Sequence, residues 1–196
     1  ETLFLSMKYG SNSSEEQRNE NDLGRFGLGM KAASLSQCTI LTVASKQNGK
    51  ISAFQWNYDK IREKKEWLVI ELDKKDISQL NGIEELKLNK SGTLVIWENF
   101  DTLEKSSGDV FTSLNEYKIK IADYLSLIFH RYLNDENEKK LNISVNKLKL
   151  KGLDPFLEKH KKTNIRQEFK LAIKDTRNTE RFVSVLPFVL PYQKDI

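Results

Sequence analysis

Three glycines, Gly24, Gly27 and Gly29, stand at G-x-x-G-x-G spacing directly before a helix-forming segment. Glycine is needed where a backbone takes positive φ or approaches a ligand closely, and the free N–H groups at the start of a helix attract anions. The segment therefore predicts a phosphate-binding turn, with a nucleotide as the first ligand to consider. A glycine-rich start of an ordinary helix is the alternative.

The glycine spacing separates this segment from the better-known phosphate-binding loops. A P-loop requires G-x-x-x-x-G-K-[ST] after an apolar strand, but Met30 stands between Gly29 and Lys31, and the preceding residues 13–21 are too polar for a buried strand. Dinucleotide-binding folds and protein kinases use G-x-G-x-x-G, in which the short gap comes first. In this chain the short gap comes last, so none of these loops fits.

The rest of the chain predicts helices packed on an antiparallel sheet. A helix is expected from about residue 27 to 37, packing through Leu28, Ala32 and Leu35. Asn48-Gly49 is a strong signal for a two-residue hairpin turn. Strands are expected over 39–46, 50–56, 67–72, 84–88 and 93–97, and a helix over 115–133. These elements predict a meander of about five antiparallel strands in an α+β fold, a two-layer α/β sandwich.

Two stretches of the sequence, together with their order along the chain, indicate a resemblance to a known family. Gly24–Lys31 is followed by a helix and then by Leu41–Lys46, and Ser91–Trp97 lies downstream. The glycine-rich stretch resembles the ATP-lid segment of the GHKL ATPases, the superfamily of gyrase B, heat-shock-ninety chaperones, MutL, MORC proteins and sensor histidine kinases. The downstream stretch resembles their Gly-Thr-bearing strand. The resemblance is strongest to the heat-shock-ninety-like and MORC-like branches, covers roughly residues 1–150 and implies a Bergerat-type fold.

The resemblance implies roles for particular residues. Backbone N–H groups of the glycine-rich stretch would hold the nucleotide phosphates, and Thr93 would face the nucleotide from its strand. The residues expected to bind phosphate are Gly24, Arg25, Phe26, Gly27, Leu28, Gly29, Met30 and Lys31. The side chains of Phe26 and Leu28 are expected to pack, and that of Arg25 to be solvated. For the Lys31 side chain, a phosphate contact and an exposed position both stay open.

The start of the chain departs from the superfamily pattern. GHKL sites begin with a helix carrying a catalytic glutamate and a magnesium-binding asparagine, followed by an Asp-x-Gly-x-Gly turn, and neither precedes Gly24 here. We therefore expect an N-terminally truncated domain, with the base upstream of Glu1 and no catalytic residue or metal ligand in this chain. The intact protein is expected to be an ATPase that uses ATP and Mg²⁺, and this segment alone to be inactive.

The pattern of the chain changes after a solvated connection near residue 136. Residues 1–136 are expected to form the ATPase domain, with a lid over about residues 8–29. Residues 137–196 contain strand-like segments at 141–145, 166–173 and 182–190 and a turn at Asp154-Pro155-Phe156. The resemblance interprets them as the incomplete beginning of a second, transducer-like α/β domain, whose phosphate-contacting lysine cannot be assigned from the sequence.

The composition bears on whether the chain binds nucleic acid, contains a disulfide or a metal site, or spans a membrane. With 38% hydrophobic residues the chain can bury a core, and its 32 basic and 28 acidic residues are nearly balanced, which is weak support for nucleic-acid binding. The single cysteine, Cys38, excludes an internal disulfide and fits the cytoplasm, and it is expected to be a buried thiol. His130 and His160 lie in no metal-ligand spacing, and no apolar run is long enough to span a membrane.

Two hypotheses of different class follow. In the first, nucleotide binding drives closure or homodimerisation of a GHKL module that acts on a protein or DNA partner. In the second, the chain is a protein- or nucleic-acid-interaction module on a degenerate scaffold without ATPase activity. A histidine kinase is disfavoured because no phosphoacceptor helix is visible.

Overall fold

The computed structural model divides the chain into two compact units, residues 1–113 and 114–196. The structure describes residues 2–8, 28–101, 109–134, 141–174, 178–192 and 194. The domain boundary predicted near residue 136 stays a prediction.

The first unit is built on an antiparallel sheet with strand order β3-β2-β1-β4. Strands β1 (Ile40–Gln47) and β2 (Lys50–Asn57) form the expected hairpin, and Gln47 pairs with Lys50 across the turn. Asn48 and Gly49 both have positive φ, 50° and 76°, as a two-residue type I′ turn requires. The hairpin and the α+β class with an antiparallel sheet are therefore confirmed.

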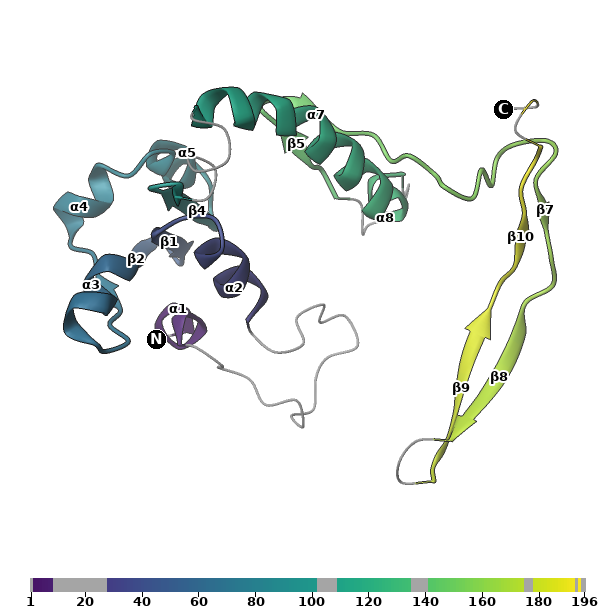
Figure 1. The fold of residues 1–196 in the computed structure, drawn as a ribbon, viewed down its shortest axis with the longest axis horizontal. Helices are drawn as coiled ribbons and strands as arrows, with labels where there is room; N and C mark the ends of the chain where they lie inside the picture. Colours follow the sequence, from purple (N-terminus) through teal and green to yellow (C-terminus); the bar gives the residue numbers. More distant parts are fainter. Residues whose placement is uncertain are drawn as a thin grey trace. The chain divides into compact units, whose positions relative to one another are not determined.

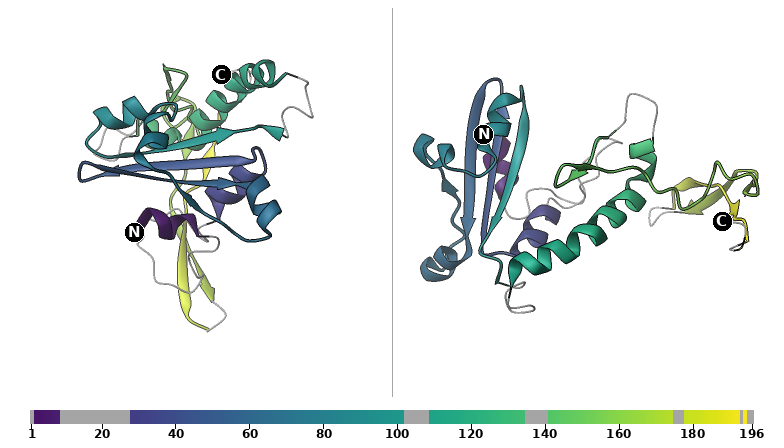
Figure 2. Two further views of the ribbon diagram at one scale, coloured as in Figure 1. Left: turned by 90° about the vertical axis from the view of Figure 1, so that its left-hand side faces the viewer. Right: turned by 90° about the horizontal axis from the view of Figure 1, so that it is seen from above.

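One face of this sheet, called the first face here, is covered by the two helices that flank the glycine-rich stretch (Figures 1 and 2). Helix α1 (Thr2–Met7) packs on β2, and α2 (Gly29–Leu35) packs beside β1. The core between them consists of Met7, Leu41, Val43, Phe54 and Trp56, with Leu3, Leu35 and Val69 at its margin. Alternation along β1 and β2 places these strand residues on one side of the sheet.

The second face is covered by α4 (Lys74–Ser78) and α5 (Ile83–Leu88), on the side of the sheet opposite α1 (Figure 1). The strand predicted over residues 84–88 is wrong, because these residues form α5. Gly82 precedes the helix at φ 83°, two glutamates occupy its first turn, and Ile83 and Leu86 are buried one turn apart. Leu88, the last residue of α5, is 88% exposed.

The predicted five-strand meander is also wrong in its connectivity. After β2 the chain forms α3 (Tyr58–Lys64) and then β3, which is only the two residues Ile70–Glu71 of the six-residue strand expected. Helices α4 and α5 then cross the second face, so that β4 (Gly92–Glu98) pairs with β1 at the opposite edge. The sheet described by the structure therefore has four strands, and β1 is internal.

The second unit combines helices with short hairpins. Helix α7 (Val110–Ile128), which begins before the unit boundary, and α8 (His130–Asn134) replace the single helix expected over 115–133. The strands are β5 (Ser144–Val145), β6 (Leu148–Lys149), β7 (Asn164–Ile165), β8 (Phe169–Lys174), β9 (Glu180–Val185) and β10 (Phe188–Val189). They pair as β5-β6, β7-β10 and β8-β9. The predicted turn at Asp154 is present, because its carboxylate accepts hydrogen bonds from the backbone N–H groups of Phe156 and Glu158.

A close backbone contact ties α8 to the following loop. Asn134 exchanges two side-chain hydrogen bonds with the backbone of Gly152, each 3.0 Å long. A Cβ at Gly152 would lie 2.5 Å from the carbonyl oxygen of His130. Glycine is therefore required at position 152 because the His130 carbonyl oxygen lies so close.

Among the helices of the described ranges, none has the length and apolar character needed to cross a membrane.

Candidate functional site

The structure covers part of the predicted phosphate-binding stretch. Gly24, Arg25, Phe26 and Gly27 lie outside the described residues, as does most of the expected lid. Leu28, Gly29, Met30 and Lys31, together with Thr93, lie within them. The described part of the candidate site therefore consists of the start of α2 and of β4, which carry these five residues.

Gly29 is the first residue of α2, and the described residues leave its surroundings open. It is not among the described residues with positive φ. A Cβ added at this position would meet no heavy atom within 4 Å. Neither backbone conformation nor packing within the described chain therefore requires glycine here. A remaining explanation for glycine at this position is that a ligand approaches the backbone N–H groups closely, which this geometry permits.

Lys31 is buried, with only 2% of its surface exposed. Its Nζ donates a hydrogen bond to the carbonyl oxygen of Lys8, the residue that follows α1. Removal of the amine from water lowers the pKa of Lys31 below its ordinary value of 10.5. Of the two alternatives left open for the Lys31 side chain, the exposed position is therefore wrong. The side chain joins α2 to the end of α1 in this structure.

Ser34, one turn after Lys31, joins α2 to the sheet. Its side chain is fully buried, and its hydroxyl donates to the carbonyl oxygen of Met30 at 2.6 Å. The indole Nε1 of Trp97 in β4 donates to the same hydroxyl oxygen at 2.8 Å. A hydroxyl can donate once and accept from another group, so both contacts are satisfied together. The first turn of α2 is thus linked by hydrogen bonds to an edge strand.

Thr93 lies on the same face of β4 as Trp97. Trp97 pairs with Leu41 and Thr93 pairs with Ser45, and both partners lie on the first face, which α1 and α2 cover. Four residues of extended strand separate Thr93 from Trp97, about 13 Å. The structure therefore places Thr93 and α2 on one side of the sheet. Thr93 is exposed, and its hydroxyl lies 3.5 Å from Ser45 Oγ.

The buried face of α2 agrees only in part with the predicted one, because Leu35 packs against the core as expected and Leu28 is half-buried. Ala32 is exposed, whereas Lys31 and Ser34 are buried on a stripe that continues to Cys38. Spacing of apolar residues did not reveal this face because its main members are polar and are satisfied by hydrogen bonds. Sequence reasoning missed Ser34 and Trp97 as partners. A signal was present for Ser34, because it lies at helical spacing from Lys31 and both follow the glycine-rich motif.

Cys38 is buried, as expected, with 1% of its surface exposed. Its Sγ lies 3.2 Å from the carbonyl oxygen of Ser34 and 3.3 Å from that of Ile40. Burial raises the pKa of the Cys38 thiol above its ordinary value of 9.0. A thiol in this state is a poor nucleophile at neutral pH, so Cys38 has a packing role.

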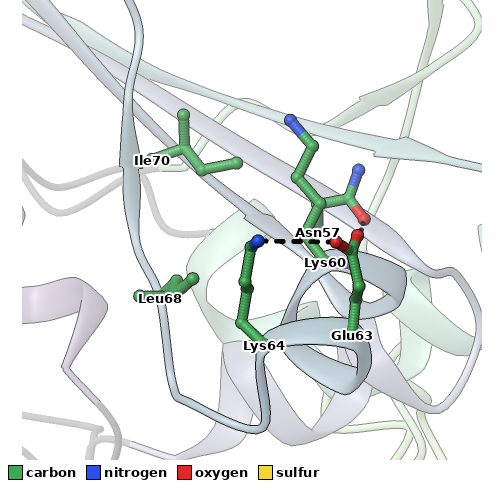
Figure 3. Close-up of a pocket in the computed structure, with 6 residues that line it drawn as sticks. All are labelled: Asn57, Lys60, Glu63, Lys64, Leu68 and Ile70. Atoms are coloured by element: carbon green, nitrogen blue, oxygen red, sulfur yellow. Dashed lines mark hydrogen bonds and ion pairs between the residues drawn. The ribbon is translucent and has the colours of Figure 1, made fainter.

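A shallow pocket of about 260 Å³ lies at the opposite edge of the sheet from β4 (Figure 3). It is lined by Asn57, Lys60, Glu63, Lys64, Leu68 and Ile70. Two of these side chains pair with each other, because Lys64 Nζ lies 3.5 Å from Glu63 Oε1, and both are mostly exposed. Asn57 accepts a hydrogen bond from the backbone of Lys60 and thereby caps α3. These polar groups are therefore engaged in surface and capping contacts.

The described ranges contain no candidate metal centre. No group of three or more His, Cys, Asp or Glu side chains there is arranged to hold a metal ion. His130 is engaged locally, with Nδ1 2.8 Å from the carbonyl oxygen of Leu127 and Nε2 4.0 Å from an Asp154 carboxylate oxygen. Within the described residues, the start of α2 and Thr93 thus lie on one side of the sheet, and α2 is linked to β4 through Ser34 and Trp97.

Comparison with known proteins gives one family. Residues 1–93 match the family model described as histidine kinase-, DNA gyrase B-, and HSP90-like ATPase. The matched segment contains the glycine-rich stretch, α2 and the sheet as far as Thr93, and it amounts to just under half of the chain. No curated protein matches the chain.

Proposed function

We propose, from the match of residues 1–93 to the histidine kinase-, DNA gyrase B-, and HSP90-like ATPase family model, that this chain is part of an ATP-binding and ATP-hydrolysing module. The family consists of nucleotide-binding, ATPase-type domains. The observation that carries the proposal is that the family match includes both the glycine-rich stretch and Thr93.

The phosphates of ATP are assigned to the glycine-rich stretch and the start of α2. The proposed ligands are the backbone N–H groups of Gly24, Arg25, Phe26, Gly27, Leu28, Gly29, Met30 and Lys31. The surroundings of Gly29 support this assignment, because no heavy atom of the described residues lies within 4 Å of a Cβ placed there. For Lys31 the backbone is proposed as the ligand, since its amine is bonded to the Lys8 carbonyl.

The strand β4 is assigned to the remainder of the nucleotide. Thr93 is exposed on the face that α2 covers, which supports a role in contacting the ligand. Magnesium is expected with ATP in this family, but the described residues offer no ligand cluster for it. The reaction proposed for the intact protein is attack of water on the γ-phosphate.

We also propose a wider role for the intact protein on the basis of the same family match. Nucleotide binding is proposed to drive a conformational change or homodimerisation that acts on a protein or DNA partner in the cytoplasm. Residues 137–196 are proposed to begin a second, transducer-like domain. The separate compact unit 114–196, with its own hairpins, supports a second structural body in this region.

Isothermal titration of the intact protein with a non-hydrolysable ATP analogue tests nucleotide binding. We expect saturable binding at one site, with competition by ADP, and phosphate release from ATP in a separate assay. Absence of binding by the intact protein would refute the proposal and favour the interaction module instead. Binding without phosphate release would restrict the function to nucleotide sensing.

A further inference from the structure

We infer that Ser34 and Trp97 are positioning residues that fix the orientation of α2, and with it the N–H groups that face the ligand. The inference rests on the proposed function for its ligand, but the positioning itself is a property of the described structure. Its basis is the relay of hydrogen bonds from the Trp97 indole through the Ser34 hydroxyl to the Met30 carbonyl.

The relay joins parts of the chain that are far apart in sequence. Ser34 and Trp97 are separated by 63 residues, and one belongs to α2 and the other to β4. The relay ends at Met30, in the first helical turn and next to Gly29. A shift of α2 along the sheet would break the bond to Trp97. It would then leave the buried Ser34 hydroxyl with one partner fewer.

The Trp97 side chain is itself held in place. Its ring meets Phe100 at a centroid distance of 6.4 Å and an interplanar angle of 64°, an edge-on arrangement that aromatic rings favour. Its backbone pairs with Leu41 in β1, an inner strand of the sheet. The indole N–H is thus presented by a rigid element, which suits a positioning contact better than a loop would.

The other side of α2 is fixed by a different contact. Lys31 Nζ donates to the carbonyl oxygen of Lys8, beside Met7, which is fully buried in the core under α1. Helix α2 has only seven residues and would not be stable alone. Its orientation is therefore set by tertiary contacts, and the relay from β4 through Ser34 to Met30 is one of them.

Two substitutions remove the relay, although Trp97→Phe also removes part of the half-exposed indole ring system. Trp97→Phe retains an aromatic ring against Phe100 but loses the N–H donor, and Ser34→Ala loses the hydroxyl. Ile83→Val is the matched control, because it trims the core on the second face, away from α2. Amide hydrogen exchange in the intact protein reports on α2 through Ala32, whose N–H donates to the Leu28 carbonyl oxygen at 2.8 Å. Amides of the β1–β2 hairpin serve as the reference.

We expect about five- to tenfold faster exchange at Ala32 in Trp97→Phe and Ser34→Ala, with hairpin amides unchanged, since one hydrogen bond is lost. The double variant should be no faster than the more severe single variant, because both remove the same link. Affinity for the ATP analogue should fall by a similar factor. Ile83→Val should alter none of these quantities relative to the hairpin.

The outcomes separate this inference from the proposed function. Unchanged exchange at Ala32, or additive effects in the double variant, would overturn the positioning role. Faster exchange with unchanged analogue affinity would overturn its relevance to the ligand. If the unsubstituted intact protein bound no analogue, the proposed function would fail, whereas the exchange data would still decide whether Ser34 and Trp97 hold α2.

Discussion

Substitution of Gly29 by alanine should separate ligand binding from folding stability. The added methyl group meets no heavy atom within 4 Å, and Gly29 is not among the described residues with positive φ, so neither strain nor overlap opposes it. Alanine is favoured over glycine inside a helix by about 1 kcal/mol, and only part of this applies at the first helical residue. We therefore expect stability to stay equal or to rise by less than about 1 kcal/mol.

In contrast to stability, the affinity of Gly29→Ala for the ATP analogue should fall. The methyl group would stand beside the N–H groups that are proposed to face phosphate. Loss of one hydrogen bond to a charged group costs about 1.5–3 kcal/mol, which corresponds to a loss of affinity of about ten- to a hundredfold. The assay is isothermal titration of the intact protein with the non-hydrolysable ATP analogue. Gly29→Ala and the unsubstituted protein are compared under the same conditions.

Gly49→Ala is the matched control, because it should lower stability and leave the affinity for the ATP analogue unchanged. Gly49 also has no heavy atom within 4 Å of an added Cβ, but its φ is 76°. An alanine in this left-handed region costs about 1–2 kcal/mol, far from α2 at the end of the hairpin. The three tryptophans, Trp56, Trp67 and Trp97, all belong to residues 1–113, so their fluorescence during urea unfolding follows this unit.

Either of two results would contradict the expectation that Gly29→Ala lowers affinity without lowering stability. Unchanged affinity in Gly29→Ala would show that ligand approach does not require glycine at this position. A loss of stability comparable to that of Gly49→Ala would show that the backbone of α2 is more constrained than its open surroundings indicate.

Other substitutions test the packing and the buried ionisable groups. Leu86→Ala should destabilise the first unit by about 2–5 kcal/mol through a cavity on the second face, and a loss below about 1 kcal/mol in urea unfolding would contradict burial of α5. Gly152→Ala should cost about 1–3 kcal/mol through overpacking against the His130 carbonyl, seen as faster amide exchange in α8; unchanged exchange would refute the contact. Because the pKa of Lys31 is lowered on folding, its contribution to stability is present above pH 10.5 and is lost as pH falls through the folded pKa. Lys31→Met should therefore abolish part of the rise in unfolding free energy from neutral pH to 10.5, and an identical pH slope would argue against burial of the amine. The Cys38 pKa is raised, so its contribution is present below pH 9.0 and is lost as pH rises through the folded pKa; Cys38→Ala should reduce that loss, and an unchanged alkaline limb would contradict it.

Local sequence signals located several elements correctly. Asn48-Gly49 predicted the hairpin because only a few residue types adopt positive φ readily, and both positions do so here. The helix after the glycines is present as α2. In contrast, residues 84–88 form a helix because Gly82 and the second core favour it, although Leu86 and Leu88 alternate like strand residues.

The site was only partly predictable for a related reason. The glycine-rich stretch and Thr93 were recognisable from spacing and from resemblance to a family that residues 1–93 match. The contacts that hold α2 were not, because Lys31, Ser34 and Trp97 have partners 23 and 63 residues away. Hydrophobic periodicity cannot identify a packed helix face whose buried members are a lysine and a serine.

Residue type and spacing within short stretches were enough to predict the hairpin turn and to reveal a glycine-rich motif that resembles the family matched by residues 1–93. The pairing of β4 with β1 and the contact between Trp97 and Ser34 became visible only in the folded chain, because α4 and α5 carry the chain across the second face to the far edge of the sheet. The physical reason is that local backbone preferences are encoded within a few residues, whereas the partner of a buried polar group depends on how distant elements pack.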